Sequence, residues 1–569
     1  MNRRKTLAFA LAGPVALSLL VAGGQAGGVP TGVASGATVE YTVLIETGVT
    51  RQAAVDAVAA AGGTVVRDAA AVGALVVNAP ANGFIQLVSA SEAVYGAAHA
   101  TPIGRIPRTE GGTLPRDEVS SEHSSTPAAA PAAAPAVGMD PLDNLLYGLH
   151  MVRSDLARSV QAGDSRVLVG VLDSGVDATH PDIAPNYNAA LSRNFATDIP
   201  ADPNGVPIDG PCEFAGCVDP PGWDDSGHGT HVAGTIAAAA NGFGVSGVAP
   251  NVSIVSIRGG QDSGYVFLQP VLDALVYGAD AGLDVINMSF YIDPWLYNCT
   301  SNPADSPEDQ LEQRTTIEAV NRALTYAHSK GVTLVNSLGN EHNDHGNPRD
   351  DVTSPDYPVG AEYPRDVDNA TCLSLPVEGK HVIGVSSLGP SFTKADYSNY
   401  GTEQITVSAP GGWFRDGLGT PSYRTNGNMV LSTYPRNVLL ARGWIDAEGN
   451  VTPAGVASAV LRYCDGTQCG YYRYIQGTSM AAPHATGVAA LIVSRFGRED
   501  ASGLTLSPGR VEDVLTSTAA NRACPDPPLQ TYVPVGRPAE FDALCVGSAE
   551  FNGFYGYGVV DAYAAVTER

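Results

Sequence analysis

The chain has 569 residues, which is longer than one average domain, so we expect it to divide into several segments. Its 44% hydrophobic and 16% charged residues are typical of a folded protein with a large core and argue against a disordered chain. The formal net charge of −26 argues against nucleic acid and anionic membrane as partners.

The first 26 residues have the pattern of a secretory signal peptide. Basic residues at positions 3–5 precede an apolar run over 7–21, and small residues then lead to a predicted cut after Ala26. The run is too short to span a membrane, so we expect a secreted, extracellular protein with no membrane attachment once the signal is removed. The pair Arg3-Arg4 leaves a twin-arginine signal open, and the alternative to export is a buried N-terminal helix.

Residues 27–108 are predicted to contain a small α+β unit with no cysteine and no cluster of catalytic residues. Its strands and helices alternate in the order βαββαβ, which is typical of a ferredoxin-like fold. The predicted elements are strands over 41–45, 64–66, 75–77 and 94–97 and helices over 50–61 and 84–89.

Residues 109–139 form a Pro/Ala-rich, low-complexity linker, which includes the run from Thr126 to Pro131. An exposed linker of this kind is easily cut by a protease. All eight cysteines and all candidate catalytic residues come after it. We therefore expect residues 140–569 to form one large domain, and the mature chain to begin between about Ile103 and Asp140.

In residues 140–569, short apolar runs alternate with helical stretches, which predicts an α/β domain with a mainly parallel sheet between helices. Sites in such domains lie at the carboxyl ends of the strands, where Asp173 and Asn340 are found. The predicted strands are 166–172, 253–257, 284–288, 331–338 and 381–386, and the predicted helices are 231–240, 268–281, 315–329 and 484–495.

Three motifs of this domain carry the parts of an activated-serine hydrolase in the order Asp, His, Ser. Ser479, in a small-residue turn before a helix, is the candidate nucleophile. His228 is the candidate base, which takes the hydroxyl proton and returns it to the leaving amine. Asp173 would hold the imidazole in one tautomer and stabilise its charged form. Asn340, together with the backbone N–H of Ser479, is the candidate oxyanion hole.

These motifs resemble those of the subtilisin-like serine peptidases, the subtilase or S8 family. The resemblance extends over about 140–565 and rests mainly on the runs 169–175, 228–237 and 477–483. It implies a three-layer domain, endopeptidase activity on protein or peptide substrates, and no cofactor for the chemistry. It also implies that residues 27–108 are an inhibitory prodomain, which acts within its own chain and is then removed. A separate binding domain is the alternative for that segment.

The resemblance implies substrate contacts along two strand edges, one at Ser289, Phe290 and Tyr291 and the other at Ser263 and Gly264. The family commonly has Ser-Leu-Gly at the first edge, so Phe290 and Tyr291 are departures. We expect Tyr291 to narrow or redirect the pocket beside the scissile bond. Simple core packing of the two aromatic side chains is the alternative.

The chain shows no complete metal-binding motif. His231 follows His228 by three residues, which raises the question of a zinc site, but no third ligand with suitable spacing is evident and we expect no catalytic metal. Members of the family often bind structural Ca2+, and the acidic loops keep this open, although no EF-hand-type loop is present.

Eight cysteines are an even number in a chain that we expect to be secreted, which favours disulfides over a metal cluster. The sequence leaves their connectivity open. Cys212/Cys217 and Cys464/Cys469 would each close a very short loop. Elimination then suggests the pairs Cys299/Cys372 and Cys524/Cys545.

The sequence thus predicts a secreted, monomeric subtilisin-like endopeptidase that is made as a zymogen. The wide gap between Asn340 and Ser479 predicts an insertion over 411–470 near the rim of the active site. This insertion and Tyr291 favour one alternative, a dedicated processing peptidase for a specific secreted precursor. A non-catalytic binding protein that retains the fold is a second alternative. An esterase of the α/β-hydrolase class is disfavoured, because no G-x-S-x-G elbow surrounds Ser479.

Overall fold

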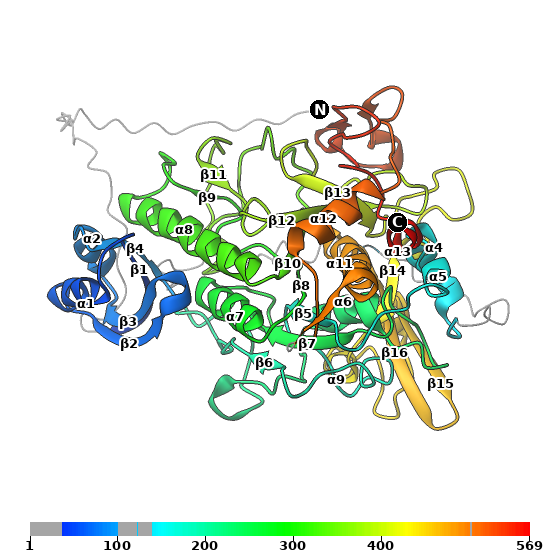
Figure 1. The fold of residues 1–569 in the computed structure, drawn as a ribbon, viewed down its shortest axis with the longest axis horizontal. Helices are drawn as coiled ribbons and strands as arrows, with labels where there is room; N and C mark the ends of the chain where they lie inside the picture. The colour runs from blue at the N-terminus through cyan, green and yellow to red at the C-terminus, as the bar shows by residue number, and fades with distance from the viewer. Residues whose placement is uncertain (1–36, 101–121, 123–138, 501–502, 569) are drawn as a thin grey trace, which may run out of the picture.

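The computed structural model describes residues 37–100, 122, 139–500 and 503–568, which form a small amino-terminal unit packed against a larger one (Figure 1). The predicted signal peptide, 1–26, and almost all of the predicted linker, 109–139, lie outside the described residues. The two units meet along helices α7 (Leu268–Asp280) and α8 (Pro307–Ser329) of the larger unit.

The amino-terminal unit is a four-stranded antiparallel sheet with the strand order β2-β3-β1-β4 and two helices. Helix α1 begins after Thr50, whose side chain accepts a hydrogen bond from the backbone N–H of Ala53. The order of elements confirms the predicted βαββαβ, ferredoxin-like arrangement. The elements are β1 (Thr38–Ile45), α1 (Arg51–Ala60), β2 (Thr64–Ala69), β3 (Ala74–Pro80), α2 (Phe84–Ser89) and β4 (Val94–His99).

The larger unit is built on a seven-stranded sheet in which every pair of neighbouring strands is parallel. Alternate residues of the central strand β5 face opposite sides, so Val169 and Val171 join one hydrophobic cluster while Leu168 and Leu172 join another. In sheet order the strands are β13 (Ile405–Pro410), β12 (Val382–Leu388), β10 (Thr333–Ser337), β8 (Val285–Met288), β5 (Leu168–Leu172), β7 (Ser253–Arg258) and β6 (Arg193–Asn194).

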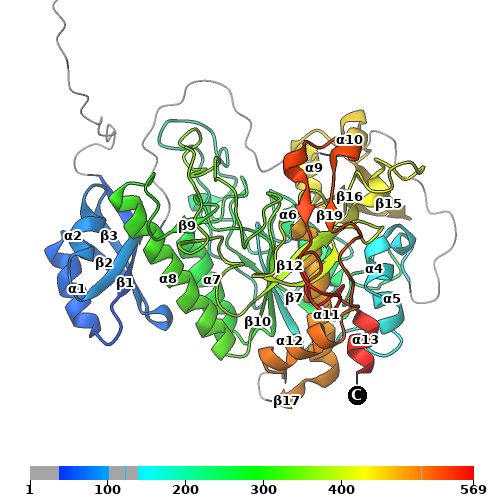
Figure 2. The same cartoon turned by 90° about the horizontal axis from the view of Figure 1, so that it is seen from above.

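Helices cover both faces of this sheet, which confirms the predicted three-layer α/β domain. Helices α6 (His228–Ala237) and α11 (Thr478–Phe496) pack on one face, and α7 and α8 pack on the other (Figure 2). Helix α11 is buried on all sides from Met480 to Val493, so it belongs to the core of the domain. The other α-helices of this unit in the described residues, outside the insertion, are α4 (Tyr147–Met151), α5 (Ser154–Ala157), α12 (Pro508–Ser517) and α13 (Ala562–Thr567).

The segment 411–470 contributes a separate three-stranded antiparallel sheet beside α6. Its tip contacts the loop before His228: the Tyr434 hydroxyl donates to the Ser226 carbonyl at 3.1 Å, and Asn437 Nδ2 donates to Asp225 Oδ1 at 2.5 Å. The segment therefore lies at the rim of the site described below. Its elements are β14 (Val430–Thr433), α9 (Arg436–Ala441), α10 (Pro453–Ala457), β15 (Val460–Asp465) and β16 (Gln468–Ile475). The last strand, β16, extends past residue 470.

All eight cysteines form disulfides, in the pairing that the sequence suggested. Three pairs cross short stretches of antiparallel strand or a tight turn, and two of the four close loops of only five positions. The pairs are Cys212–Cys217, Cys299–Cys372, Cys464–Cys469 and Cys524–Cys545. Three small two-stranded sheets complete the unit: β9 (Asn298–Cys299) with β11 (Cys372–Leu373), β17 (Arg498–Asp500) with β18 (Gly503–Thr505), and β19 (Leu529–Gln530) with β20 (Ala543–Leu544).

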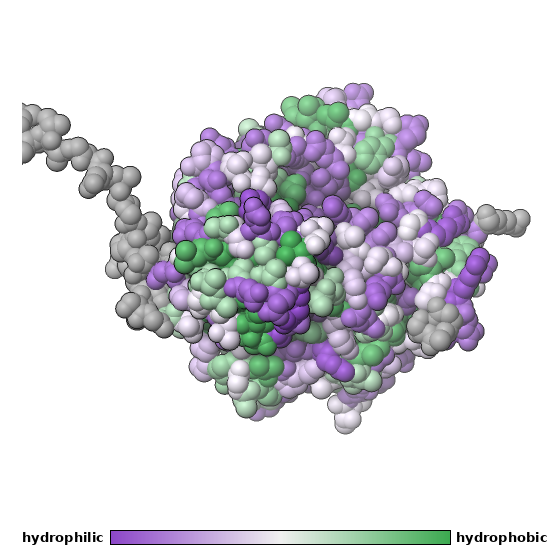
Figure 3. Space-filling model, turned by 60° about the vertical axis from the view of Figure 1, so that its left-hand side comes forward, coloured by the Kyte–Doolittle hydropathy of each residue, from purple (hydrophilic) through white to green (hydrophobic). Residues whose placement is uncertain are grey.

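The surface is mixed in character. On the face drawn in Figure 3, hydrophilic residues are interspersed with smaller hydrophobic patches. Within the described residues, every helix is too short or too polar to cross a membrane.

Two of the disulfides enclose very different lengths of chain, which tests how much each one contributes to the free energy of unfolding. Cys299 and Cys372 are 73 positions apart, whereas Cys464 and Cys469 are five apart. In the chain-entropy account a disulfide stabilises more when it closes a longer loop, by about 4 kcal/mol for the first pair and about 2 kcal/mol for the second. We expect the double variant Cys299→Ala/Cys372→Ala to lose more free energy of unfolding than Cys464→Ala/Cys469→Ala. Denaturant unfolding in a Ser479→Ala background measures both, and equal losses would contradict the expectation.

Candidate active site

The predicted triad lies at the carboxyl edge of the central strands. Asp173 directly follows β5, and Ser289 directly follows the neighbouring strand β8. Since Leu172 pairs with Met288 in the sheet, these two strand ends are adjacent. His228, the first residue of α6, contacts Asp173, and Ser479, the second residue of α11, contacts Ser289. Two helix starts therefore meet two strand ends at one place.

Asp173 and His228 are joined directly. Asp173 Oδ1 lies 2.7 Å from His228 Nδ1, and it also accepts the backbone N–H of Ser174 at 2.8 Å. The Asp173 side chain is 5% exposed and the imidazole is 34% exposed, so the ring opens to solvent while its partner is buried. A carboxylate at Nδ1 favours the tautomer with the proton on Nδ1, which leaves Nε2 as the basic nitrogen.

Asp224 fixes the geometry on both sides of this contact. Its Oδ2 accepts the backbone N–H of Thr230 at 3.0 Å and the hydroxyl of the same residue at 2.6 Å, which caps α6. Its Oδ1 accepts the Ser174 hydroxyl at 3.0 Å and the backbone N–H of Gly227 at 2.8 Å. One buried carboxylate therefore holds both the turn after Asp173 and the start of the helix that carries His228.

Ser479 is tied to the end of β8 in two directions. Its hydroxyl donates to the Ser289 carbonyl at 3.2 Å, and the Ser289 hydroxyl donates back to the Ser479 carbonyl at 3.2 Å. That carbonyl has no partner one turn along α11, because Pro483 lacks an N–H. The proline thus releases the acceptor through which the nucleophile turn is fastened to the strand.

Asn340 is oriented by the residue that precedes Ser479. Its side-chain oxygen accepts the backbone N–H of Thr478 at 2.9 Å and the Thr478 hydroxyl at 3.0 Å. This contact turns the side-chain amide group, Nδ2, toward the other side as a donor. The N–H of Ser479 lies in the first turn of α11, where helical amides have no partner within the helix. The two donors have the chemistry that an oxyanion requires.

The predicted substrate-binding residues lie beside the site, but outside named strands. Ser263 and Gly264 form a turn after β7, in which the Gly264 N–H donates to the Gln261 carbonyl and φ is +88°. A positive φ of this kind is a conformation that glycine adopts readily. Substrate contact at Ser263 and Gly264 stays a prediction. Phe290 is half-buried against the α7/α8 layer, and the Tyr291 hydroxyl donates to Asp356 Oδ2 at 2.8 Å. Both aromatic side chains thus have packing partners of their own.

Asn287 is a residue of this site that the sequence analysis missed. Its Nδ2 donates to the Ser289 hydroxyl at 2.9 Å, and its Oδ1 accepts the Thr486 hydroxyl of α11 at 2.9 Å. It therefore links β8 to the helix of the nucleophile. The sequence pointed to it in one way: Asn287 is a polar residue inside the predicted buried strand 284–288. A buried amide needs hydrogen-bond partners, and in a strand these come from another element.

His231 has no metal-binding geometry. Its Nε2 faces the backbone carbonyls of Val430 at 3.1 Å and Arg473 at 3.0 Å. Burial lowers the pKa of His231 to about 3, so the ring is neutral and donates to the insertion sheet. This contact fastens the 411–470 segment to α6.

In the part of the chain that the structure describes, two groups of acidic side chains come close enough together to ligate a cation: Asp198, Asp219 and Asp262, and Glu213, Asp225 and Asp262. The buried Arg258 pairs with all three members of the first group, so its guanidinium already supplies the cation there. In the second group, burial raises the pKa of Asp262 to about 8 and that of Asp225 to about 6. The second group shares Asp262 with the Arg258 cluster, and calcium binding stays a prediction.

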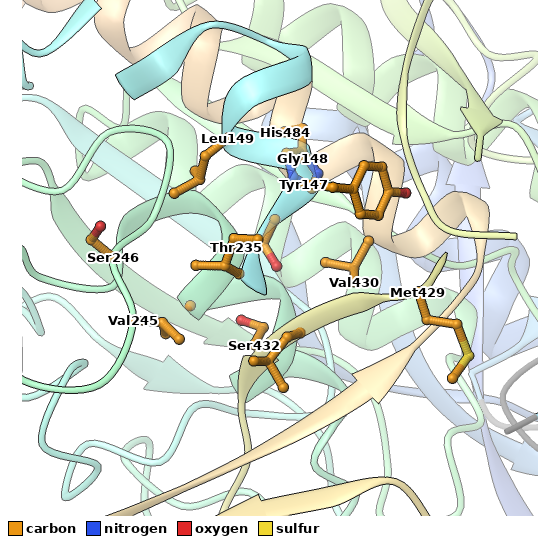
Figure 4. Close-up of a pocket in the computed structure, with 13 residues that line it drawn as sticks. Tyr147, Gly148, Leu149, Thr235, Val245, Ser246, Met429, Val430, Ser432 and His484 are labelled. Atoms are coloured by element: carbon orange, nitrogen blue, oxygen red, sulfur yellow. The ribbon is translucent and has the colours of Figure 1, made fainter. Parts of the chain in front are cut away.

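A small internal cavity lies between α4, α6 and β14, and none of the triad residues lines it (Figure 4). Leu149, Val245 and Met429 are among the residues that line it, together with His484 of α11. Burial lowers the pKa of His484 to about 4, and its Nδ1 faces the Met480 carbonyl at 2.8 Å. The cavity is therefore part of the core beside α11.

A serine at a helix start, an imidazole and a buried carboxylate at the carboxyl edge of a parallel sheet define the site class of a serine peptidase. The profile of the subtilase family matches residues 164–558, which is more than half of the chain. The chain therefore belongs to the subtilase family and is a serine endopeptidase.

Relatives and solved structures agree with this assignment. Subtilisin DY of Bacillus licheniformis is 26% identical over 375 residues, covering 66% of this chain and 91% of that protein. Fervidolysin of Fervidobacterium pennivorans is 29% identical over 366 residues, covering 63% of this chain and only 39% of that protein. The crystal structure of the epidermin leader peptide processing serine protease of Staphylococcus aureus has 18% identity and a TM-score of 0.58, and the match covers 93% of this chain and 98% of that one. At that identity the likeness shows the fold.

Asp224 provides a test of the geometry. We expect Asp224→Ala to lower the free energy of unfolding by about 3 kcal/mol, because buried donors of Ser174, Gly227 and Thr230 lose their acceptor. The control is Asp513→Ala, on the exposed face of α12, which should change stability by less than about 0.5 kcal/mol. Urea unfolding in a Ser479→Ala background measures both, and similar values for the two variants would contradict this role.

Proposed function

We propose that the chain hydrolyses peptide bonds of proteins through an acyl-enzyme on Ser479, with His228 as general base and Asp173 as the partner of its imidazole. The observation that carries the proposal is the 2.7 Å contact between Asp173 and His228, next to the strand end that holds Ser479. A serine hydroxyl reacts at neutral pH only when a base takes its proton.

The catalytic cycle has two halves. In the first, Ser479 Oγ attacks the substrate carbonyl carbon while His228 Nε2 takes the hydroxyl proton. Asn340 Nδ2 and the backbone N–H of Ser479 donate to the oxyanion of the tetrahedral intermediate. The C–N bond then breaks, and His228 gives its proton to the leaving amine. In the second half a water, deprotonated by His228, attacks the acyl carbonyl carbon. The bond between that carbon and Ser479 Oγ then breaks, and His228 returns the proton to Oγ.

The amino-terminal unit is proposed to be the inhibitory prodomain of a secreted zymogen. In support, it buries apolar residues such as Leu44 against the α7/α8 layer, Arg67 pairs with Asp273, and the N–H of His99 donates to Glu312 at 2.8 Å. Four disulfides suit an oxidising extracellular environment. We also propose that the mature enzyme acts as a monomer.

A dedicated processing peptidase is the second candidate. Two observations favour it: Tyr291 is held beside Ser289 by its bond to Asp356, and the 411–470 segment stands at the rim next to His228. The matching Staphylococcus aureus protease is described as processing a leader peptide. A narrow site would accept few sequences, so an extended peptide library distinguishes the candidates. Cleavage at one motif supports the processing role, and cleavage of many unrelated peptides and of casein supports a broad endopeptidase.

The roles of Ser479 and Asn340 are tested by two variants and a control. We expect Ser479→Ala to abolish casein hydrolysis. We expect Asn340→Ala to lower kcat by about 10² to 10³ with little change in KM, which is the known cost of deleting one oxyanion-hole donor from a subtilisin. Asn347→Ala, at an exposed position, serves as control and should behave as wild type. Steady-state kinetics on a peptide substrate decide the matter. Undiminished kcat in Asn340→Ala, or residual hydrolysis by Ser479→Ala, would contradict the assigned roles.

A further inference from the structure

A glutamate of the predicted linker is bound to the larger unit. Glu122 Oε1 accepts Arg415 Nε at 2.8 Å and lies 3.4 Å from Arg537 Nη2, while Oε2 accepts Gln476 Nε2 at 3.0 Å. Both carboxylate oxygens are therefore engaged by residues nearly 300 or more positions away. The side chain is 14% exposed, so it is largely withdrawn from solvent.

The two arginines are positioned by the larger unit itself and carry an excess of positive charge. Arg415 Nη1 donates to the Val535 carbonyl at 2.8 Å, and Arg537 Nε donates to Asp396 Oδ2 at 2.6 Å. Asp396 is fully buried and is the carboxylate that, besides Glu122, pairs with both arginines among the described contacts. Two guanidinium groups beside one carboxylate favour a second carboxylate ligand.

Gln476 connects this site to the nucleophile. It follows β16 and directly precedes the Gly477-Thr478-Ser479 turn, and it is 2% exposed. Its Oε1 accepts the backbone N–H of Phe414 at 2.6 Å, which directs Nε2 toward the carboxylate. Glu122 is therefore bound by a side chain that lies three positions before Ser479 in the chain.

We propose that Arg415, Arg537 and Gln476 form a carboxylate-binding site whose ligand is the Glu122 side chain, and that this contact anchors the linker during maturation. The amino-terminal unit ends with β4 at His99, which contacts α8, whereas Glu122 is bound beside the nucleophile turn.

The bond that is cut therefore lies between the unit and its anchor, on the amino-terminal side of Glu122. Hydrolysis there breaks one C–N bond, and water supplies the hydroxyl of the new carboxyl group and the hydrogen of the new amine. Glu122 then remains bound to the mature enzyme. This inference rests on the proposed self-processing by Ser479.

The first test is the mature N-terminus. Full-length wild type, Glu122→Gln and the control Glu448→Gln, at an exposed position of the larger unit, are purified, and maturation is followed by intact mass. We expect wild type and the control to yield one mature chain that still contains position 122. Glu122→Gln should mature about tenfold more slowly and with several N-termini, because a neutral amide loses the charge-assisted bonds to both arginines. A wild-type N-terminus beyond position 122, or a Glu122→Gln variant that matures like wild type, would overturn the proposal.

A second test separates this inference from the proposed function. In a Ser479→Ala background the chain cannot process itself, and added trypsin reports how accessible the linker is at Arg116. We expect Glu122→Gln to be cut there about tenfold faster than the parent and than Glu448→Gln. Equal rates would refute the anchor. If Glu122→Gln raises the trypsin cleavage rate tenfold but the enzyme with intact Ser479 does not cleave itself, the carboxylate site is upheld and the self-processing is refuted.

Discussion

The close approach between the end of β5 and the start of α6 is the constraint on which the site depends. Asp173 and His228 are 55 positions apart in the chain, and they meet because a side chain is absent where the two elements touch. A Cβ at Gly229 would lie 2.1 Å from the Gly175 carbonyl, so even alanine would push the helix away. Asp224 then locks the approach by bonding to both elements.

The position of the nucleophile is fixed by hydrogen bonds between the first turn of α11 and two strand ends. Its first turn is tied to the end of β8 through Ser289 and to the end of β10 through Asn340. Pro483 makes the first tie available because it leaves the Ser479 carbonyl without a helical partner. Donors and acceptors that are held in this way need little reorganisation when charge develops on a substrate, which is the physical basis of electrostatic preorganisation.

Much of this arrangement could be predicted from local sequence, because each catalytic residue lies in a short motif of small residues and the strands are continuous apolar runs. The start of α8 could not be predicted in this way. The helix begins at Pro307 rather than near 315, because its first turns are polar and a capping box between Ser306 and Asp309 starts it. The turn at Ser263 was also missed, because a positive φ at Gly264 is a backbone feature. The Glu122 contact joins residues too distant for any local pattern to connect.

The central claim is that Ser479 is activated by His228. A fluorophosphonate reacts covalently only with an activated serine hydroxyl, so its adduct can be located by mass spectrometry and its rate of formation measured. The account predicts one adduct, on the peptide that contains Ser479, which is lost in His228→Ala. An adduct on another serine, or an unchanged rate in His228→Ala, would contradict it.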